Sequence, residues 1–292
     1  MDGSPQVLIT PTELAEALSG EHPPVVLDVR YGGPQGERPG GRETYATGHI
    51  PGAVYADLDL ELAAHDRPAT EGRHPLPAET DFAASVRRWG IREGQPVVVT
   101  DDFKNFWAAR AWWLLRYAGI ADVRILDGSL RGWRDAGLPL ESGDVVPEPG
   151  DARVVYGALP VLDIDGAEDF ADAGVLLDSR AHERYTGEEE PIDPRAGHIP
   201  GARNAPVGGL VDATGRFLPP EQLRANYAAL GIVPGTAVAA YCGSGVTASF
   251  QAAALTIAGF APLLYPGSFS AWANSGREVV TGAEPYAPGD ED

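Results

Sequence analysis

The sequence predicts an α/β protein built from two tandem copies of one domain, each with a central, mostly parallel sheet flanked by helices. Short apolar strands alternate with helical patterns along the chain, which is typical of a parallel sheet covered on both faces. The same series of motifs also begins again near the middle of the chain, which marks a repeated unit. At 292 residues, 43% of them hydrophobic, the chain is long enough for two globular domains.

Four segments recur in the same order. VVLDVR recurs as VLLDSR with a shift of 150, and GHIPGA recurs with a shift of 149. WGIREGQPVVVTD corresponds to LGIVPGTAVAAYC with a shift of 141, and DGSLRGW corresponds to PGSFSAW with a shift of 139. From this repeat we expect a first domain over 5–140, a Pro-, Gly- and acid-rich linker over 141–160, a second domain over 161–282 and an acidic, solvated tail over 283–292.

In the first copy, local signals define each element in turn. Thr10, Pro11 and Glu13 form a capping box with proline at the first helical position, which predicts a short helix. Apolar runs bounded by turn residues predict strands, and apolar residues at helical spacing predict helices. The expected strands are 24–30, 95–101 and 122–128, and the helices that come after the first are 80–89, 105–119 and 129–137.

The second copy is organised around Cys242, the only cysteine of the chain. Residues 237–241 predict a buried strand, and 247–258 predict a helix that stops at Gly259. A thiol between a strand and a helix N-terminus faces loop N–H groups, which favour the thiolate. Cys242 is therefore the candidate nucleophile, with an inert buried cysteine as the alternative. The small residues that let the backbone curl around an anion beside it are Gly243, Ser244 and Gly245.

The sequence around this loop lacks residues that dinucleotide binding, phosphatase chemistry or a redox cysteine pair would need. A dinucleotide-binding loop needs a carboxylate about 20 positions later, and a phosphatase loop needs an arginine at the position of Ala248. A single cysteine also has no partner for a redox pair. The first copy carries Asp101 at the position of Cys242, and an aspartate cannot replace a sulfur nucleophile. We therefore expect the first copy to be a scaffold and the second to carry the reaction.

Composition restricts the partners and the compartment. A formal net charge of −20 argues against nucleic acid or an anionic membrane as a partner, because their phosphates would be repelled. No run approaches the roughly 20 apolar residues of a membrane span, and the N-terminus lacks a secretory pattern. One cysteine excludes an intramolecular disulfide and is consistent with a reducing compartment. We expect a cytoplasmic protein that binds neither nucleic acid nor membrane.

Two copies of GHIPGA, each with a closing GS…W element, and the loop CGSGVTA in the second copy alone resemble the tandem rhodanese family of sulfurtransferases. The loop is similar to that of 3-mercaptopyruvate sulfurtransferases, and the resemblance covers residues 5–282. It implies two rhodanese-like domains in an enzyme whose Cys242 takes a sulfane sulfur from a small anionic donor and becomes a persulfide. The outer sulfur then passes to cyanide or to a thiol, with thioredoxin and glutathione as candidate acceptors. The resemblance implies no cofactor and no metal.

The resemblance also implies roles for individual residues. Arg184 stands where the family has an arginine that faces the anionic group of the donor, whereas Arg195 does not match the family's second arginine and is expected to be structural or at the pocket rim. Ser244, His74 and Asp59 correspond to a relay for proton handling. The residues expected to line the donor site with Arg184 are Gly243, Gly245, Val246 and Thr247.

Two alternatives remain beside 3-mercaptopyruvate sulfur transfer. Thiosulfate-specific members of the family usually carry basic residues directly after the cysteine, and Gly243 and Ser244 are neutral, which favours 3-mercaptopyruvate as the donor. Thiosulfate:cyanide sulfur transfer is the alternative activity. The alternative of another class is a non-catalytic carrier that holds a persulfide on Cys242.

Overall fold

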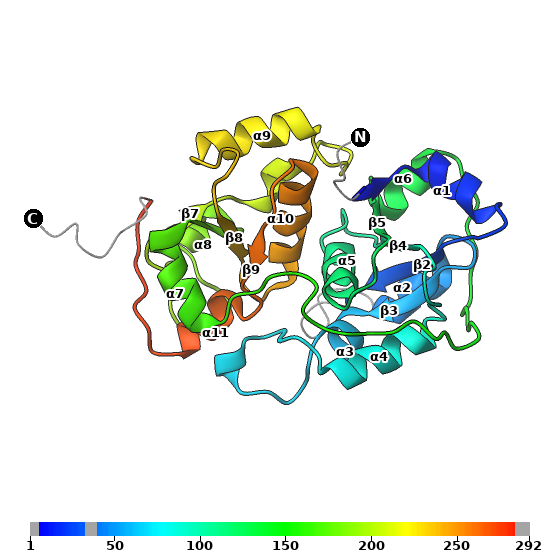
Figure 1. The fold of residues 1–292 in the computed structure, drawn as a ribbon, viewed down its shortest axis with the longest axis horizontal. Helices are drawn as coiled ribbons and strands as arrows, with labels where there is room; N and C mark the ends of the chain where they lie inside the picture. Colours follow the sequence, from blue (N-terminus) through cyan, green and yellow to red (C-terminus); the bar gives the residue numbers. More distant parts are fainter. Residues whose placement is uncertain (1–5, 33–39, 284–292) are drawn as a thin grey trace, which may run out of the picture. The chain divides into compact units, whose positions relative to one another are not determined.

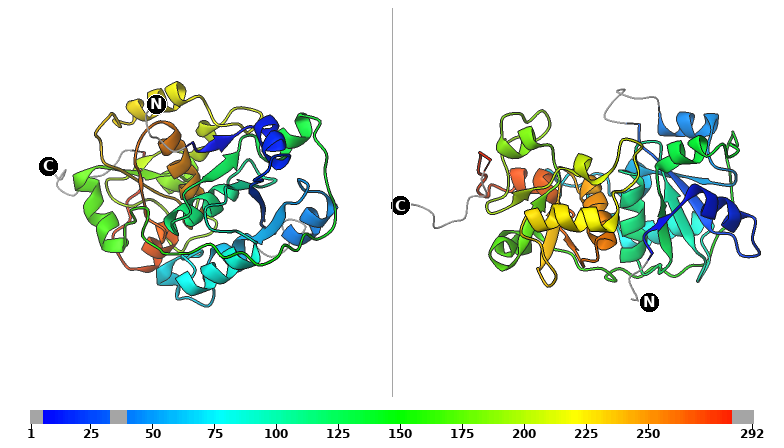
Figure 2. Two further views of the ribbon diagram at one scale, coloured as in Figure 1. Left: turned by 45° about the vertical axis from the view of Figure 1, so that its right-hand side comes forward. Right: turned by 90° about the horizontal axis from the view of Figure 1, so that it is seen from above.

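The computed structural model describes residues 6–32 and 40–283, so the expected acidic tail lies outside the described residues apart from Ala283 (Figure 1). The chain divides into two compact units. The first unit is made of 1–65, 76–159 and 212–217, and the second is made of 66–75, 160–211 and 218–292. Each unit is a parallel sheet flanked by helices, as the sequence predicts (Figure 2).

The first unit has a five-stranded sheet in the order β1-β5-β4-β2-β3. Its neighbouring strands are parallel, and Leu27 of β2 is in register with Val54 of β3 on one side and Val99 of β4 on the other. Its elements are β1 (Leu8–Ile9), α1 (Pro11–Leu18), β2 (Val25–Arg30), α2 (Gly41–Thr47), β3 (Val54–Asp57), α3 (Leu58–Leu62), α4 (Glu79–Arg88), β4 (Val97–Thr100), α5 (Ala108–Tyr117), β5 (Val123–Leu126) and α6 (Ser129–Asp135). The predicted capping box is present at the start of α1.

The second unit has a four-stranded parallel sheet in the order β7-β6-β8-β9. Its elements are η1 (Ala69–Glu71), α7 (Ile164–Ala173), β6 (Val175–Asp178), α8 (His182–Thr186), β7 (Arg203–Asn204), η2 (Val207–Leu210), α9 (Pro220–Ala229), β8 (Val238–Tyr241), α10 (Val246–Ile257), β9 (Leu263–Leu264) and α11 (Ser268–Asn274). Strand β8 and helix α10 begin and end within one residue of the prediction, and Cys242 lies between them.

A buried ion pair explains why VVLDVR and VLLDSR recur with GHIPGA. In the first unit, Arg30 Nε donates to Asp28 at 2.5 Å, and Arg30 Nη2 donates to the carbonyl of Gly48, the first residue of GHIPGA, at 3.3 Å. In the second unit, Arg180 Nη2 donates to Asp178 at 2.5 Å and to the carbonyl of the corresponding glycine at 2.7 Å. The arginine at the end of the strand therefore fixes the start of the GHIPGA turn in both copies.

An aromatic pair holds the other end of the same turn. Tyr45 stacks on His49 of GHIPGA with ring centroids 4.2 Å apart, and its hydroxyl donates to the carbonyl of Ala53, the last residue of the motif, at 2.7 Å. Tyr185 repeats the stack in the second unit at 3.7 Å, and its hydroxyl donates to the carbonyl of Ala202 at 2.7 Å. The motif recurs because each copy uses it to close the same turn.

The closing GS…W element is also the same in the two copies. Ser129 and Ser268 adopt positive φ values, 59° and 55°, and begin α6 and α11. The N–H of the next residue donates at 2.9 Å to the carbonyl of the residue directly after the central strand, which is Asp101 in the first unit and Cys242 in the second. The predicted correspondence of Asp101 with Cys242 therefore has a structural basis.

In the first unit, the carboxylate of Asp101 fills its own loop. It accepts four backbone hydrogen bonds between 2.7 and 3.1 Å, from Phe103, Asn105, Trp107 and Ala108. Complete burial raises the pKa of Asp101 to about 6 although these N–H groups favour the ionised form. The loop after β4 is thus occupied by a side chain of the protein itself.

The segment 66–75 belongs to the second unit, although it lies within the stretch expected as the first domain. Its backbone is attached there by a hydrogen bond from the N–H of Arg73 to Ser270 Oγ, at 3.0 Å. Arg73 and His74 are therefore part of the unit that contains Cys242. Within the described ranges, no helix has the length and apolar character to cross a membrane.

Replacing Asp101 by alanine is expected to destabilise the first unit by about 3 kcal/mol, because four buried N–H groups lose their acceptor. Urea unfolding of the variant measures the loss. The control is Asp135→Ala, which removes an exposed carboxylate from the same unit. Since this copy is expected to be a scaffold, the reaction at Cys242 should keep its wild-type rate in the folded variant. Equal stabilities of the Asp101 and Asp135 variants would contradict the role of the carboxylate.

Candidate active site

Cys242 directly follows β8 and is 1% exposed. The N–H of Gly245 donates to its Sγ at 3.1 Å, so the loop directs a backbone dipole at the sulfur. The N–H of Cys242 itself donates to Ser268 Oγ at 3.2 Å, and its carbonyl accepts from Phe269 at 2.9 Å. These bonds fix the cysteine backbone against the start of α11 and hold the sulfur at the start of α10.

The loop needs glycine at position 245. Gly245 has φ +84°, and a Cβ there would lie 2.3 Å from the carbonyl oxygen of Pro266. Helix α10 begins at the next residue, Val246. Of the residues predicted in this loop, Ser244 and Thr247 are partly exposed, whereas Cys242, Gly243, Gly245 and Val246 are buried.

Two guanidinium groups approach the loop where Gly243 has no side chain. The position that a Cβ on Gly243 would occupy lies 2.9 Å from Arg73 Nη2 and 3.3 Å from Arg184 Nη1. The resemblance to the rhodanese family implies that Arg184 faces an anionic donor, whereas it does not single out Arg73. An anion beside Cys242 would therefore meet two cationic groups that converge on the residue next to the sulfur.

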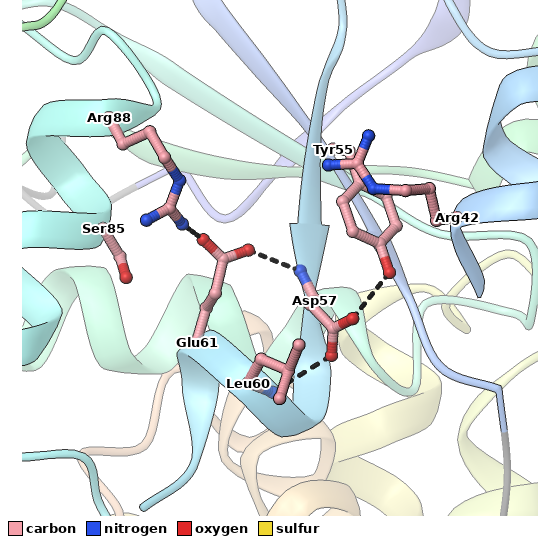
Figure 3. A pocket seen from close by; sticks show the side chains of 7 residues that line it. All are labelled: Arg42, Tyr55, Asp57, Leu60, Glu61, Ser85 and Arg88. Atoms are coloured by element: carbon pink, nitrogen blue, oxygen red, sulfur yellow. Dashed lines mark hydrogen bonds and ion pairs between the residues drawn. The ribbon is translucent and has the colours of Figure 1, made fainter. Parts of the chain in front are cut away.

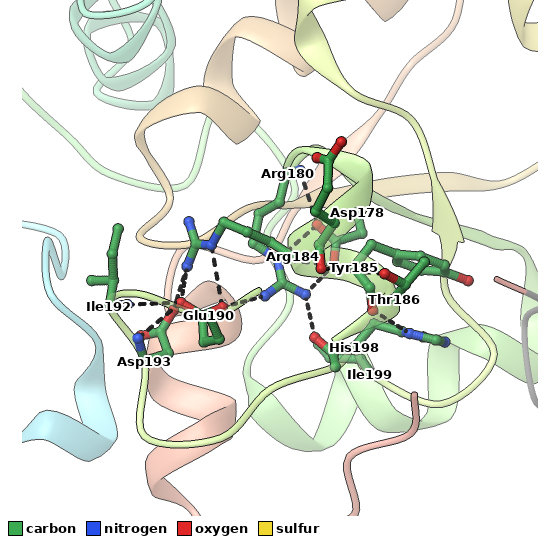
Figure 4. A network of polar contacts seen from close by, with 12 residues as sticks. Asp178, Arg180, Arg184, Tyr185, Thr186, Glu190, Ile192, Asp193, His198 and Ile199 are labelled. Carbon is green, nitrogen blue, oxygen red and sulfur yellow. Dashed lines mark hydrogen bonds and ion pairs between the residues drawn. The ribbon is translucent and has the colours of Figure 1, made fainter. Parts of the chain in front are cut away.

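Ion pairs with carboxylates hold both arginines in place, and Figure 4 shows the part of this network around Arg184 and Glu190. Arg184 Nη2 donates to Glu190 at 2.7 Å and to Asp193 at 2.9 Å, and Arg73 Nη1 contacts the other oxygen of Asp193. On its far side, Glu190 accepts from Arg180 Nη1 at 3.3 Å. The network therefore runs from the buried arginine at the end of β6 to the arginines beside the cysteine loop.

The carboxylate of Glu190 is the central connection of this network. Burial by itself would raise its pKa, but hydrogen bonds from Arg184 and from the N–H groups of Asp193 and Ile192 outweigh burial and hold the pKa below its ordinary value. Glu190 is thus ionised at neutral pH and fixes Arg184 from behind. Glu188 and Glu189 of the acidic run 188–190 are exposed, whereas the side chain of Glu190 is 3% exposed and lies in ion pairs.

The other predicted residues lie in separate parts of the chain. Arg195 directs its guanidinium at the end of α11, where it donates to the carbonyls of Ala273 at 2.9 Å and of Trp272 at 2.9 Å. Arg195 therefore binds carbonyl groups at the end of α11, in agreement with a structural role. Asp59 lies in α3 of the first unit and His74 lies in the segment 66–75 of the second, so their relay with Ser244 stays a prediction.

The first unit contains a cavity of about 480 Å³, which differs from the cysteine loop in its charge balance and in its lack of a thiol (Figure 3). Arg88 contacts Glu61, and the hydroxyl of Tyr55 donates to Asp57 at 2.7 Å. The cavity contains two arginines, Arg42 and Arg88, but Asp57 and Glu61 balance their charges, and no residue that lines it is a nucleophilic thiol. This cavity is therefore a weaker candidate site than the cysteine loop of the second unit.

Sequence reasoning missed two residues that the structure places at the loop, Ser268 and Arg73. A signal for Ser268 is present in the sequence, because the GS pair of DGSLRGW recurs in PGSFSAW and a repeated serine at positive φ holds the backbone of Cys242. The only signal for Arg73 is its position beside His74, a predicted relay residue, because the segment that carries both lies 169 residues before the cysteine.

The fold and the site together define a two-domain α/β protein with one buried cysteine between a strand and a helix, and with two arginines that converge on the residue after it. The chain belongs to the rhodanese family, since the rhodanese-like domain matches residues 10–136 and 164–275. It is 44% identical over 283 residues to SseB of Mycobacterium tuberculosis, named as a thiosulfate sulfurtransferase, with 96% of this chain and 98% of that protein covered. A Pseudomonas aeruginosa protein named as a 3-mercaptopyruvate sulfurtransferase is 45% identical, with 94% and 97% covered. The crystal structure of SseA from Escherichia coli, a 3-mercaptopyruvate sulfotransferase, matches with a TM-score of 0.80 at 31% identity over 90% of this chain and 98% of that one.

Replacing Glu190 by glutamine should destabilise the second unit in a pH-dependent way. The pKa of Glu190 is lower in the folded protein than in the unfolded chain, so its charge adds stability above the ordinary value of 4.5 and this contribution is lost as the pH falls through the folded pKa. We expect a loss of about 2 kcal/mol at pH 7 that shrinks steadily below pH 4.5.

Urea unfolding at a series of pH values measures this difference, with Glu189→Gln on the exposed neighbour as the control. A loss that stays constant from pH 7 to pH 3.5 would show that the charge of Glu190 does not stabilise the network.

Proposed function

We propose that the protein is a sulfurtransferase that moves a sulfane sulfur from 3-mercaptopyruvate to a thiol or cyanide through a persulfide on Cys242. The observation that carries the proposal is the loop after β8. There a buried sulfur accepts an N–H bond from Gly245 and lies beside Gly243, on which two guanidinium groups converge. The loop thus combines a nucleophile with groups that hold an anionic donor.

The reaction has two steps. The Cys242 thiolate attacks the sulfur of 3-mercaptopyruvate, an S–S bond forms, and the C–S bond breaks with its electron pair leaving as the enolate of pyruvate. A proton then converts the enolate to pyruvate. In the second step a thiolate or cyanide attacks the outer sulfur, the S–S bond breaks, and Cys242 is regenerated as a thiolate. The N–H of Gly245 supports negative charge on the Cys242 sulfur in both steps.

An anionic donor is attracted by positive charge at the site, although the protein as a whole is negatively charged. The chain has a formal net charge of −20, which repels a free anion at long range. Arg184 and Arg73 offset this field at the loop, because their guanidinium groups converge on Gly243. In this proposal Arg184 binds the carboxylate of the donor, with Gly243, Gly245, Val246 and Thr247 around it.

The balance of charge in the network favours a donor with one negative charge. Arg184 and Arg73 are already opposed by the carboxylates of Glu190 and Asp193, so these four side chains carry no net positive charge, and a dianion such as thiosulfate would leave more charge uncompensated than a monoanion. The neutral Gly243 and Ser244 add no positive charge. The relatives carry both donor names, so the relative efficiency with the two donors tests this part of the proposal.

Finer assignments belong to the same proposal. We assign residues 161–282 as the catalytic domain, with the segment 66–75 as part of its unit, and the rest of 5–140 as the scaffold, joined by 141–160. We place the protein in the cytoplasm, where its single thiol stays reduced. Ser244, His74 and Asp59 would supply the proton that the pyruvate enolate takes up. Thioredoxin and glutathione are the candidate thiol acceptors.

Cys242→Ser is expected to abolish sulfur transfer while the fold is kept. The hydroxyl fits the space of the thiol but cannot form a persulfide, so turnover should fall to the uncatalysed background. Intact-mass measurement after incubation with 3-mercaptopyruvate should show one added sulfur on wild type and none on the variant. A folded Cys242→Ser protein that still turns over would refute the mechanism, and a persulfide without turnover would favour the carrier function.

Arg184→Ala is expected to lower kcat/KM for 3-mercaptopyruvate by on the order of 10- to 100-fold, mainly through KM, because the carboxylate loses charge-assisted hydrogen bonds. Lysine should restore part of the loss, since it keeps the charge but not the planar fork. Wild type should have the higher kcat/KM with 3-mercaptopyruvate than with thiosulfate.

The control for Arg184 is Arg224→Ala, which removes an exposed arginine from the same unit. An Arg184→Ala enzyme equal to this control with both donors would exclude Arg184 from donor binding, and a wild type that prefers thiosulfate would replace the donor assignment.

A further inference from the structure

We infer that Arg73 is a second donor-binding residue, which binds the carbonyl oxygen of the donor and the enolate oxygen formed from it while Arg184 binds the carboxylate. This inference rests on the proposed function and adds to it a residue that acts on the charge produced when the C–S bond breaks. It is carried by the position of the guanidinium at the cysteine loop and by the way the backbone and Asp193 hold it there.

The backbone of Arg73 is fixed against the start of α11, which also fixes Cys242. Its N–H donates to Ser270 Oγ at 3.0 Å, and the preceding Gly72, at φ +95°, approaches so closely that a Cβ there would lie 2.6 Å from the carbonyl oxygen of Gly267. The N–H of Ser270 in turn donates to the carbonyl of Gly243 at 2.8 Å. The arginine and the cysteine loop are thus attached to the same short stretch of backbone.

Asp193 aligns the side chain of Arg73 with that of Arg184. Its carboxylate is 1% exposed, and one oxygen contacts Arg73 Nη1 while the other accepts from Arg184 Nη2 at 2.9 Å. Each guanidinium therefore has one end on Asp193 and directs the other, Nη2 of Arg73 and Nη1 of Arg184, at the space over Gly243. A buried carboxylate shared by two arginines sets their spacing.

The two arginines differ in how much of their charge is already opposed. Arg184 contacts two carboxylates, Glu190 and Asp193, and its side chain is 18% exposed. Arg73 contacts Asp193, which it shares with Arg184, and its side chain is 33% exposed. More of the positive field of Arg73 is therefore available to a charge that develops during the reaction.

A donor such as 3-mercaptopyruvate presents two oxygen groups to these arginines. Its carboxylate is charged from the start, whereas its carbonyl oxygen gains charge only when the C–S bond breaks and the electron pair moves into the enolate. A group that binds this oxygen stabilises the transition state more than the bound donor and so raises kcat, whereas a group that binds the carboxylate equally in both lowers KM. Thiosulfate has no carbonyl oxygen, so it does not need this contact.

The experiment measures kcat and KM for both donors in wild type, Arg73→Ala and Arg73→Lys. The matched control is Arg67→Ala, an arginine of the same segment that is 53% exposed and is paired with Glu71. We expect Arg73→Ala to lower kcat with 3-mercaptopyruvate by on the order of 10- to 100-fold with little change in KM. Lysine should restore part of kcat, the loss with thiosulfate should be below about threefold, and the control should equal wild type.

The outcomes separate this inference from the proposed function. A wild type without activity on 3-mercaptopyruvate would refute the proposed function before any variant is compared. With an active wild type, an Arg73→Ala enzyme whose kcat equals that of the control overturns the inference, whatever its KM. An equal loss with both donors also overturns it, because it would reflect a general disturbance of the loop. If the alanine variant does not fold, Arg73→Lys and Arg73→Gln provide the same comparison.

Discussion

The buried contact between Arg180 and Asp178 is the constraint on which the rest of the second unit depends. Arg180 lies at the end of β6, donates to Asp178 and to the carbonyl of Gly197, and packs its guanidinium 3.8 Å from the ring centroid of Phe269 in α11. Burial alone would lower the pKa of Arg180, but the charge of Asp178 outweighs burial, so the pKa is raised and the arginine stays charged. The strand, the GHIPGA turn and the closing helix meet at this one side chain. Its remaining donor reaches Glu190, and through Glu190 the scaffold determines where a cation stands at the cysteine loop.

The first unit has the same arginine–aspartate contact but not the network that links it to a cysteine loop. Arg30 binds Asp28 in the same way, but its remaining donor goes to Asp102 at 2.8 Å, on the loop that Asp101 fills. The two copies therefore share the interactions that build the sheet and its turn, and they differ in the loop after the central strand. In the first unit, a carboxylate satisfies the loop N–H groups; in the second, a thiol lies at the corresponding place and accepts a hydrogen bond from the N–H of Gly245.

The repeat made the architecture predictable from the sequence. Alternating strands and helices, the paired motifs and the position of Cys242 between β8 and α10 are all encoded in local patterns, which is why the bounds of β8 and α10 agree within one residue. The charged network could not be predicted in this way. Glu190 and Asp193 lie in an acidic, Pro-containing run that resembles a solvated loop, and only tertiary packing shows that both are buried against arginines. The position of Arg73 depends on a contact between segments more than a hundred residues apart, and local sequence patterns do not predict such a contact.

The assignment of segment 66–75 to the second unit has a consequence for the engineering of the molecule. A duplicated domain is ordinarily a module that can be excised, transplanted or inherited alone. Here the stretch between α3 and α4 of one copy completes the other, so a cut near residue 160 would yield a carboxyl-terminal half without Arg73 or His74. The two copies are therefore not separable at the linker, although the first copy carries Asp101 where the second carries Cys242.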